Sequence, residues 1–152
     1  MGLALSPVVG LISAVRRSRM FHPAGLVCSA HVEPVSSLGT GAGIVAARLA
    51  GPALVRWSSA WWKQGEHIDV LGCAIRFTSA PLGAEPHAGD QDLLLATIQR
   101  PWSLPFAPLT TRVHDFLDNA YFGVSPFEVP PIGCGEWRLV AEGAPEPGQS
   151  RK

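Results

Sequence analysis

The chain carries little charge, and the charge it has is balanced. Of its 152 residues 16% are charged, and twelve basic residues match twelve acidic ones. A neutral chain lacks the basic surface with which proteins bind nucleic acid, so we expect no nucleic-acid partner. Hydrophobic residues make up 47%, which excludes a disordered chain and is enough for a core. The length fits one domain, or part of a larger architecture.

Cysteine is scarce and shows neither a metal-binding nor a disulfide pattern. Cys28, Cys73 and Cys134 are widely spaced, their number is odd, and no C-x-x-C occurs. We expect three buried, reduced thiols, which suit a reducing compartment and therefore a cytoplasmic protein.

A long hydrophobic run is also lacking. The apolar stretch at the N-terminus is interrupted by Pro7 and Gly10 and is too short to cross a bilayer. Its arginines follow it, whereas those of a secretory signal come first. We therefore expect an N-terminal arm over residues 1–20 and no membrane partner. The alternative is a signal peptide or a membrane anchor.

What the chain does contain is a series of short segments with strand periodicity. Residues 25–34 alternate, with apolar Leu26 and Cys28 on one face. Similar apolar segments predict further strands at 52–59, 70–77 and 91–99. The sequence thus predicts a mainly β (α+β) fold, a barrel or strongly curved antiparallel sheet over residues 21–142.

A few helices are expected beside this sheet. The alanine-rich segment 39–51 ends at a glycine and predicts a short helix, and the spacing of apolar residues predicts another over 107–123. Residues 125–131 and 136–142 suggest a closing pair of strands around a turn at 132–135. The segment 143–152 has the composition of a disordered tail.

One strand carries an arginine among apolar residues. Because strand side chains alternate, Leu54, Arg56 and Ser58 share a face of the predicted strand. A buried arginine needs a carboxylate, a phosphate or an anionic ligand. The alternative is an arginine on the solvent face of a one-sided sheet. For Arg76 in the next strand, the solvent face is the expected place.

The histidines do not form an evident site. His22 precedes a proline, so it is either a turn residue or a general acid/base just before a strand. His67 and Asp69 could form half of a metal site, but no second cluster completes it. The chain has no G-x-S-x-G elbow, phosphate loop or dinucleotide fingerprint.

Four short blocks taken together are more specific. In order they are R-x-x-H-x-x-G at 19–25, V-R-W-S at 55–58, D-V-L-G-C-A-I-R-F at 69–77 and G-D-Q-D-L-L-L-A-T at 89–97. This series resembles the haem catalase superfamily, most closely its small catalase-like relatives. The resemblance covers roughly residues 17–100 and, more loosely, 124–142.

The resemblance implies a catalase-like antiparallel β-barrel, partly truncated, and haem as the cofactor. His22 falls on the distal catalytic histidine, and Ser58 on the serine that hydrogen-bonds it. Arg19 and Arg56 fall on arginines that pair with the haem propionates. The substrate class so implied is a peroxide, from which the imidazole takes a proton and to which it returns one.

Two positions depart from the pattern and leave two hypotheses open. The only tyrosine, Tyr121, stands outside the R-x-x-x-Y context of the iron ligand, and Ala96 replaces the catalytic asparagine. One hypothesis is a haem-binding, peroxide-handling enzyme. The other is a degenerate scaffold or small-ligand-binding protein without haem or catalysis. The axial ligand and a homo-oligomeric state are left open.

Overall fold

The computed structural model describes residues 25–35, 39–62, 67–79, 85–130 and 132–142. The predicted N-terminal arm at 1–20 and the predicted tail at 143–152 lie outside the described residues.

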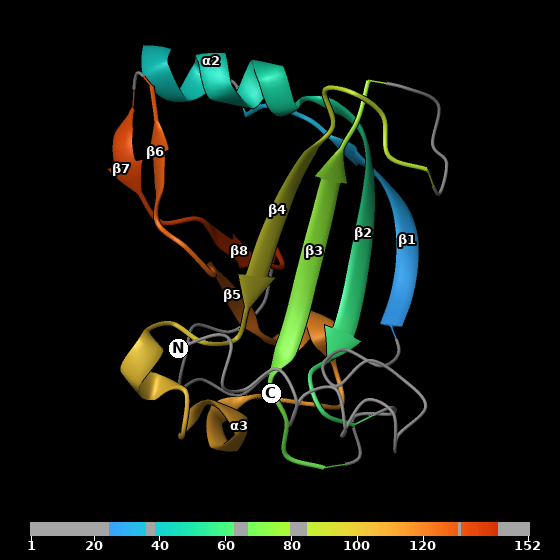
Figure 1. Ribbon diagram of the computed structural model, residues 1–152, viewed down its shortest axis with the longest axis vertical. Coiled ribbons are helices and arrows are strands. Elements are labelled where there is room, and N and C mark those ends of the chain that lie inside the picture. Colours follow the sequence, from blue (N-terminus) through green and yellow to red (C-terminus); the bar gives the residue numbers. More distant parts are fainter. Residues whose placement is uncertain (1–24, 36–38, 63–66, 80–84, 131, 143–152) are drawn as a thin grey trace, which may run out of the picture.

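The fold is mainly β, built on one curled antiparallel sheet (Figure 1). Its strand order is β1-β2-β3-β4-β5-β8, so the first four strands are neighbours in sequence and in space. Within the described residues β1 does not pair with β8, so the sheet is a half-barrel rather than a closed barrel. The bounds are β1 Gly25–Val32, β2 Gly51–Ser59, β3 Leu71–Phe77, β4 Gln91–Ala96, β5 Ala120–Gly123 and β8 Arg138–Val140.

The four strands predicted before residue 100 are confirmed, and so is the first helix. Helix α2 (Thr40–Leu49) connects β1 to β2 and lies across one end of the sheet (Figure 1). The chain turns from the helix into β2 at Gly51, whose φ of 120° favours glycine.

The helix predicted over 107–123 is wrong. Helix α3 spans only Ala107–Thr110, followed by a 3-10 turn, η2 (Phe116–Asp118), and then by strand β5. The hydroxyls of Thr110 and Thr111 both donate to the Ala107 carbonyl. Such local side-chain bonds, here joined by those of Asp115 and Asn119, offer the backbone an alternative to the helix.

The predicted closing pair of strands is also wrong in its pairing. Strand β6 (Phe127–Val129) pairs with β7 (Gly133–Gly135), the segment expected to be a turn, and β8 pairs with β5 instead. The hairpin reverses where the Ile132 amide donates to the Val129 carbonyl at 2.6 Å and Gly133 takes a φ of 91°. A short 3-10 turn, η1 (Pro101–Ser103), completes the elements.

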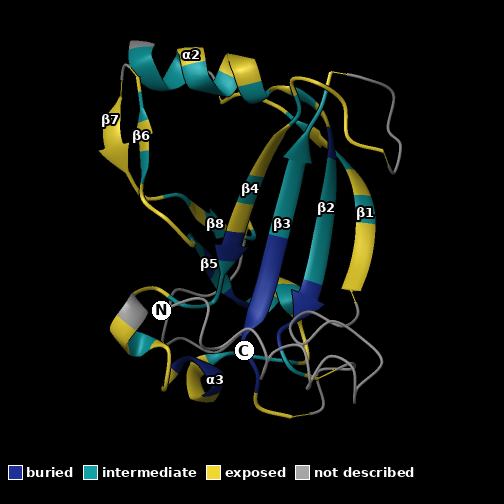
Figure 2. Ribbon diagram, in the orientation of Figure 1, coloured by how far each residue is buried: buried dark blue, intermediate teal, exposed yellow. Residues whose placement is uncertain are grey.

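The core lies on the face of the sheet that carries Trp57. Its most buried members come from β3, β4 and β5, and the Trp57 ring lies 5.1 Å from that of Tyr121. Figure 2 shows most of the buried residues gathered toward one end of β2, β3 and β4, far from α2, while buried Ala53 lies near the other end of β2. The core residues are Leu71, Cys73, Leu95 and Tyr121, with Val55, Trp57, Ile75, Leu93, Phe116, Trp137 and Leu139 packed against them.

Candidate functional site

Arg56 and Ser58 lie on the face of the sheet opposite the core. Arg56 stands in register with Val27 of β1 and Ala74 of β3. Ser58 stands in register with two glycines and is 3% exposed, while Arg56 is half-buried. The alternation predicted for these two residues is therefore present in the folded strand.

Gly25, the last residue of the R-x-x-H-x-x-G block, has a packing role beside Arg56. A Cβ atom added at Gly25 would lie 2.6 Å from the Trp57 carbonyl oxygen and 3.0 Å from the Arg56 Nε. The Arg56 side chain thus lies against the bare backbone of β1. A larger residue at position 25 would have to displace the backbone of β2 at Trp57. Glycine at this position therefore allows the Arg56 side chain to pack against β1.

Arg19 and His22 lie outside the described residues. The structure therefore describes neither their distance from Arg56 and Ser58 nor their partners. The grouping of all four residues at one site stays a prediction of the resemblance.

Tyr121 does not fit the role of an iron ligand. Its hydroxyl donates to the Phe116 carbonyl at 2.8 Å, and the residue is 1% exposed. Burial, with the nearby Cys73 and Asp115, raises the pKa of Tyr121 well above its usual value, which opposes the tyrosinate form. The residue also packs on the core face, whereas Ser58 faces the other way, so the sheet separates them.

The described residues consequently fit haem in part only. Arg56 could pair with a carboxylate of such a group, but Tyr121, the sole tyrosine, is engaged in the core. In the part of the chain that the structure describes, no group of three or more His, Cys, Asp and Glu side chains could hold a metal ion.

Arg76 lies on the outer face, as expected, and forms an ion pair there. Its Nε and Nη2 donate to the two carboxylate oxygens of Asp92 at 2.8 and 3.0 Å. The hydrogen bond from Arg76 lowers the pKa of Asp92 below its usual value. Arg76 and Asp92 stand opposite each other in the sheet, so this bidentate ion pair joins β3 to β4. Arg76 therefore has a structural role.

Asp69 is a structural carboxylate rather than half of a metal site. It is completely buried and accepts the amide protons of Trp61 and Trp62 at 2.9–3.1 Å and of Val70 at 2.7 Å. Both carboxylate oxygens are therefore used to shape the connection between β2 and β3. His67 instead places its ring 4.9 Å from that of Trp62.

The three thiols are free but differ in exposure. Cys73 is buried, as expected, and its burial raises its pKa to about 12, so it remains a protonated thiol. Cys28 is only half-buried and Cys134 is exposed on β7, so the expectation of three buried thiols is wrong for these two. An edge strand and a short hairpin leave their side chains accessible.

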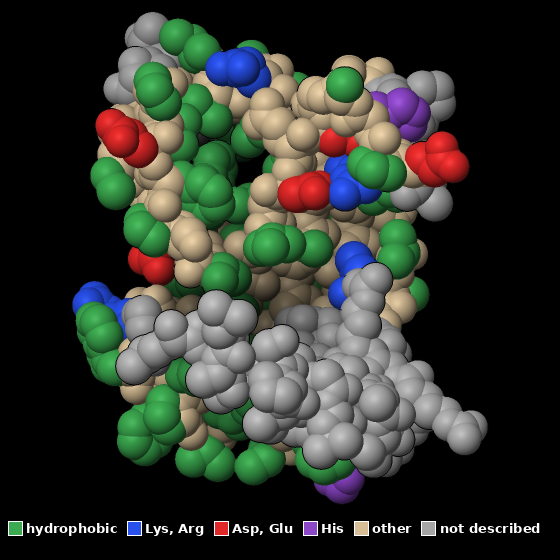
Figure 3. Space-filling model, viewed as in Figure 1, with side chains coloured by type: hydrophobic (Ala, Val, Ile, Leu, Met, Phe, Trp, Pro, Cys, Tyr) green, Lys and Arg blue, Asp and Glu red, His purple; other side chains and the backbone are tan. Residues whose placement is uncertain are grey.

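The sequence did not reveal a cleft that opens beneath α2. This α2 cleft has a volume of about 220 Å³ and lies between the helix, the β3–β4 end of the sheet and the β6–β7 hairpin. Figure 3 shows the molecule hollowed between these elements, with hydrophobic side chains at the border. It is lined by Val45, Arg48, Leu49, Phe77, Gln91, Asp92, Leu93, Phe127, Glu128, Val129, Pro130 and Trp137.

The walls of the α2 cleft are apolar and its rim is charged. Phe77, Phe127 and Trp137 supply aromatic surface, and all three are half-buried. At the rim, Asp92 is held by Arg76, while Arg48 and Glu128 are exposed. No linear motif could have predicted this site, because its lining comes from five segments spread over more than half of the chain.

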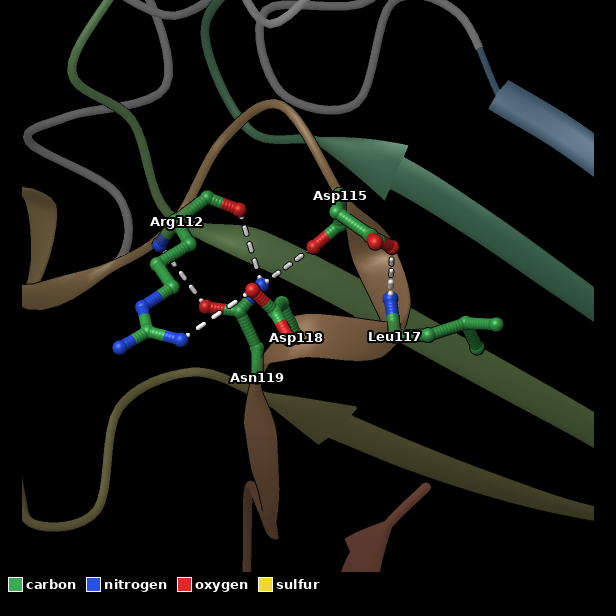
Figure 4. Close-up of polar contacts among 5 residues, drawn as sticks. All are labelled: Arg112, Asp115, Leu117, Asp118 and Asn119. Carbon is green, nitrogen blue, oxygen red and sulfur yellow. Dashed lines mark hydrogen bonds and ion pairs between the residues drawn. The ribbon is translucent and has the colours of Figure 1, made fainter. Parts of the chain in front are cut away.

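A separate polar cluster occupies the turn between α3 and β5 (Figure 4). The Asn119 side chain bonds both the amide and the carbonyl of Arg112 and also the Asp115 carbonyl, at 2.7–2.9 Å. Asp115 accepts the Leu117 amide, and Arg112 pairs with Asp118 at 3.1 Å. All of these contacts lie within residues 112–119, so the cluster shapes the turn and has a structural role.

No protein-family model, curated protein or solved structure matches this chain. Among the helices of the described residues, none is both long and apolar enough to span a membrane.

Proposed function

We propose that this protein is a non-catalytic binding module that holds a small, mainly apolar ligand in the α2 cleft. The observation that carries the proposal is the cleft itself, with aromatic walls and a volume of about 220 Å³. An apolar cavity of about 150 Å³ holds one benzene, and sites for drug-sized ligands begin at about 300 Å³. The ligand is therefore a single ring or a short aliphatic chain.

Arg48 at the rim could bind a carboxylate on that ligand. Arg48 is exposed in the last turn of α2, and no ion pair to it is formed by the described residues. Two acidic residues line the rim. Asp92 is paired with Arg76, so Glu128 is the one acidic side chain of the lining whose charge would oppose a bound carboxylate. A carboxylate on Arg48 would gain a charge-assisted bond while its ring contacts Trp137 and Phe127.

The test is a set of three probes of equal size and different charge. Benzoate, benzyl alcohol and benzylamine are titrated separately into the labelled protein, and backbone amide shifts are followed by NMR. We expect the shifts to map to the cleft, with benzoate binding most tightly. Arg48→Ala should weaken benzoate about three- to tenfold and leave benzyl alcohol unchanged.

Arg100→Ala is the matched control. Arg100 lies over the Trp102 ring at 5.2 Å and does not line the cleft, so its removal should change no affinity. If none of the three probes moves the resonances of the cleft residues, the binding function is rejected.

A second candidate is the haem-binding, peroxide-handling function implied by the resemblance. It is supported by the shared face of Arg56 and Ser58 and by the half-buried position of Arg56. In that function Arg56, with Arg19, would pair with the propionates, Ser58 would orient His22, and His22 would move a proton. Haem would supply the redox chemistry with peroxide. Tyr121 and Ala96 argue against it.

An absorption spectrum separates the two candidates. The protein is expressed with ample haem and scanned through the Soret region. A stoichiometric band that is lost in Arg56→Ala and kept in Arg76→Ala would favour haem. His22→Ala should then lose peroxide turnover while retaining the band. A folded protein without a Soret band would reject this second candidate. For either candidate we propose a cytoplasmic location, supported by the free thiols.

A further inference from the structure

Strand β1 forms one edge of the main sheet. It pairs with β2 along its whole length, from Gly25 opposite Ser58 to Val32 opposite Gly51. On its other side no described segment pairs with it, since the strand order begins at β1. Figure 1 shows β1 at the outer margin of the half-barrel.

Strand β1 itself carries none of the sequence features that usually protect a sheet edge. Proteins guard such edges with charged residues, proline, bulges or very short strands. Strand β1, GLVCSAHV, has eight residues, no charged residue and no proline, and its register with β2 runs without a bulge. Leu26 and Val27 are each 58% exposed. The opposite edge, β8, is only three residues long and carries Arg138.

We propose that the β1 edge pairs with the β1 edge of a second copy of this chain. The two strands run antiparallel about a two-fold axis perpendicular to the sheet. Each copy then supplies the hydrogen-bond donors and acceptors that the other lacks, and the two half-barrels share one continuous sheet.

The side chains of β1 can pack against those of the same strand in a second copy. A two-fold axis of this kind places residues of the same face opposite one another. The core-side row of Leu26, Cys28 and Ala30 would therefore meet its own copy and extend the apolar face. Because β1 has no charged residue, no like charges meet at the axis.

The test is the mass of the protein in solution as a function of concentration. Light scattering after size exclusion is measured from about 1 μM to about 1 mM, with reductant throughout to exclude disulfides through Cys28 or Cys134. We expect a dimer that dissociates on dilution. Hydrogen exchange should show the β1 amides becoming less protected at the low end of the range.

Val27→Glu is designed to break the pair without harming the monomer. Val27 is exposed and stands opposite Arg56, so the new carboxylate meets a cation within its own chain. Across the axis it meets its own copy at about 7–8 Å if the strands centre on Cys28. The dissociation constant should rise about tenfold or more.

Leu94→Glu is the matched control. Leu94 lies on the same face of the sheet and is 55% exposed, but it belongs to β4, away from the edge. It should leave the mass unchanged. A monomer at every concentration in the wild-type protein overturns the proposal, and so does a dimer that Val27→Glu and Leu94→Glu affect equally. The wild-type measurement decides even if a variant does not fold.

Discussion

The two halves of this chain are held together by different kinds of hydrogen bond. Residues 25–96 form four strands of eight, nine, seven and six residues, joined by uninterrupted backbone pairing. In residues 97–142 the strands have only three or four residues. There, side chains such as Asn119 and Tyr121 bond to the backbone and replace the missing ladder.

The two halves meet at Thr97. Its hydroxyl oxygen accepts the Leu71 amide at 3.1 Å and lies 2.9 Å from the Thr111 hydroxyl. One side chain thus connects β3 to the end of α3. We therefore expect the regular ladder to tolerate most single side-chain changes, whereas the irregular region depends on a few polar residues.

The largest effect is expected at Asp69, the polar exception within the regular half. Asp69→Ala removes the acceptor of three buried or part-buried amides and should cost about 3–5 kcal/mol of unfolding free energy. Urea unfolding followed by circular dichroism measures it. Asp115→Ala, which loses one exposed bond to the Leu117 amide, should cost about 1 kcal/mol. Equal costs would contradict the role given to Asp69.

Asn119 should be the most sensitive residue of the irregular half. Asn119→Ala removes one accepted and two donated bonds and should cost about 2–3 kcal/mol. Hydrogen exchange should show residues 111–123 opening before β2 and β3. Glu136→Ala, at an exposed position of the same half, serves as the control and should stay within about 0.5 kcal/mol of wild type. Uniform loss of protection over both halves would remove the distinction between them.

Tyr121 tests whether the core tyrosine is structural. Tyr121→Phe deletes the bond to the Phe116 carbonyl but keeps the ring against Trp57, so we expect a loss of about 1 kcal/mol. Tyr121→Leu also removes the ring contact and should cost about 3 kcal/mol. Thermal unfolding of both variants measures this. If Tyr121→Phe alone abolished a Soret band, the tyrosine would be a ligand and our interpretation would be wrong.

The smallest effect is expected at the ion pair of the regular half. The pKa of Asp92 is lowered by Arg76, so the stabilising contribution is present above the unfolded carboxyl pKa of about 3.9 and is lost as the pH falls through the lower folded value. Asp92→Asn should therefore be slightly less stable than wild type at pH 6 and equal to it in strong acid. Urea unfolding at pH 2 to 6 checks this. A gap that widened toward low pH would contradict the sign.

Much of the regular half was predictable because its periodicity is local. The alternation of apolar residues predicted β1 to β4 within a few residues at their ends, and it placed Arg56 and Ser58 on one face. The helix predicted for residues 107–123 was wrong because the spacing of apolar residues carries no information on hydrogen bonds. Here the side chains of Asp115 and Asn119 bond to the backbone and compete with the helix. The α2 cleft had no sequence signal, and the site implied for Arg19 and His22 stays a prediction.

The secondary structure of the first half and the neutral charge are properties of the sequence alone. These follow from side-chain alternation and composition, which act over a few residues. The pairing of β8 with β5, the bonds of the Thr97 hydroxyl to Leu71 and Thr111, and the apolar cleft under α2 depend on the tertiary structure. Those features join residues far apart in the chain, and the packing that brings them together has no local pattern.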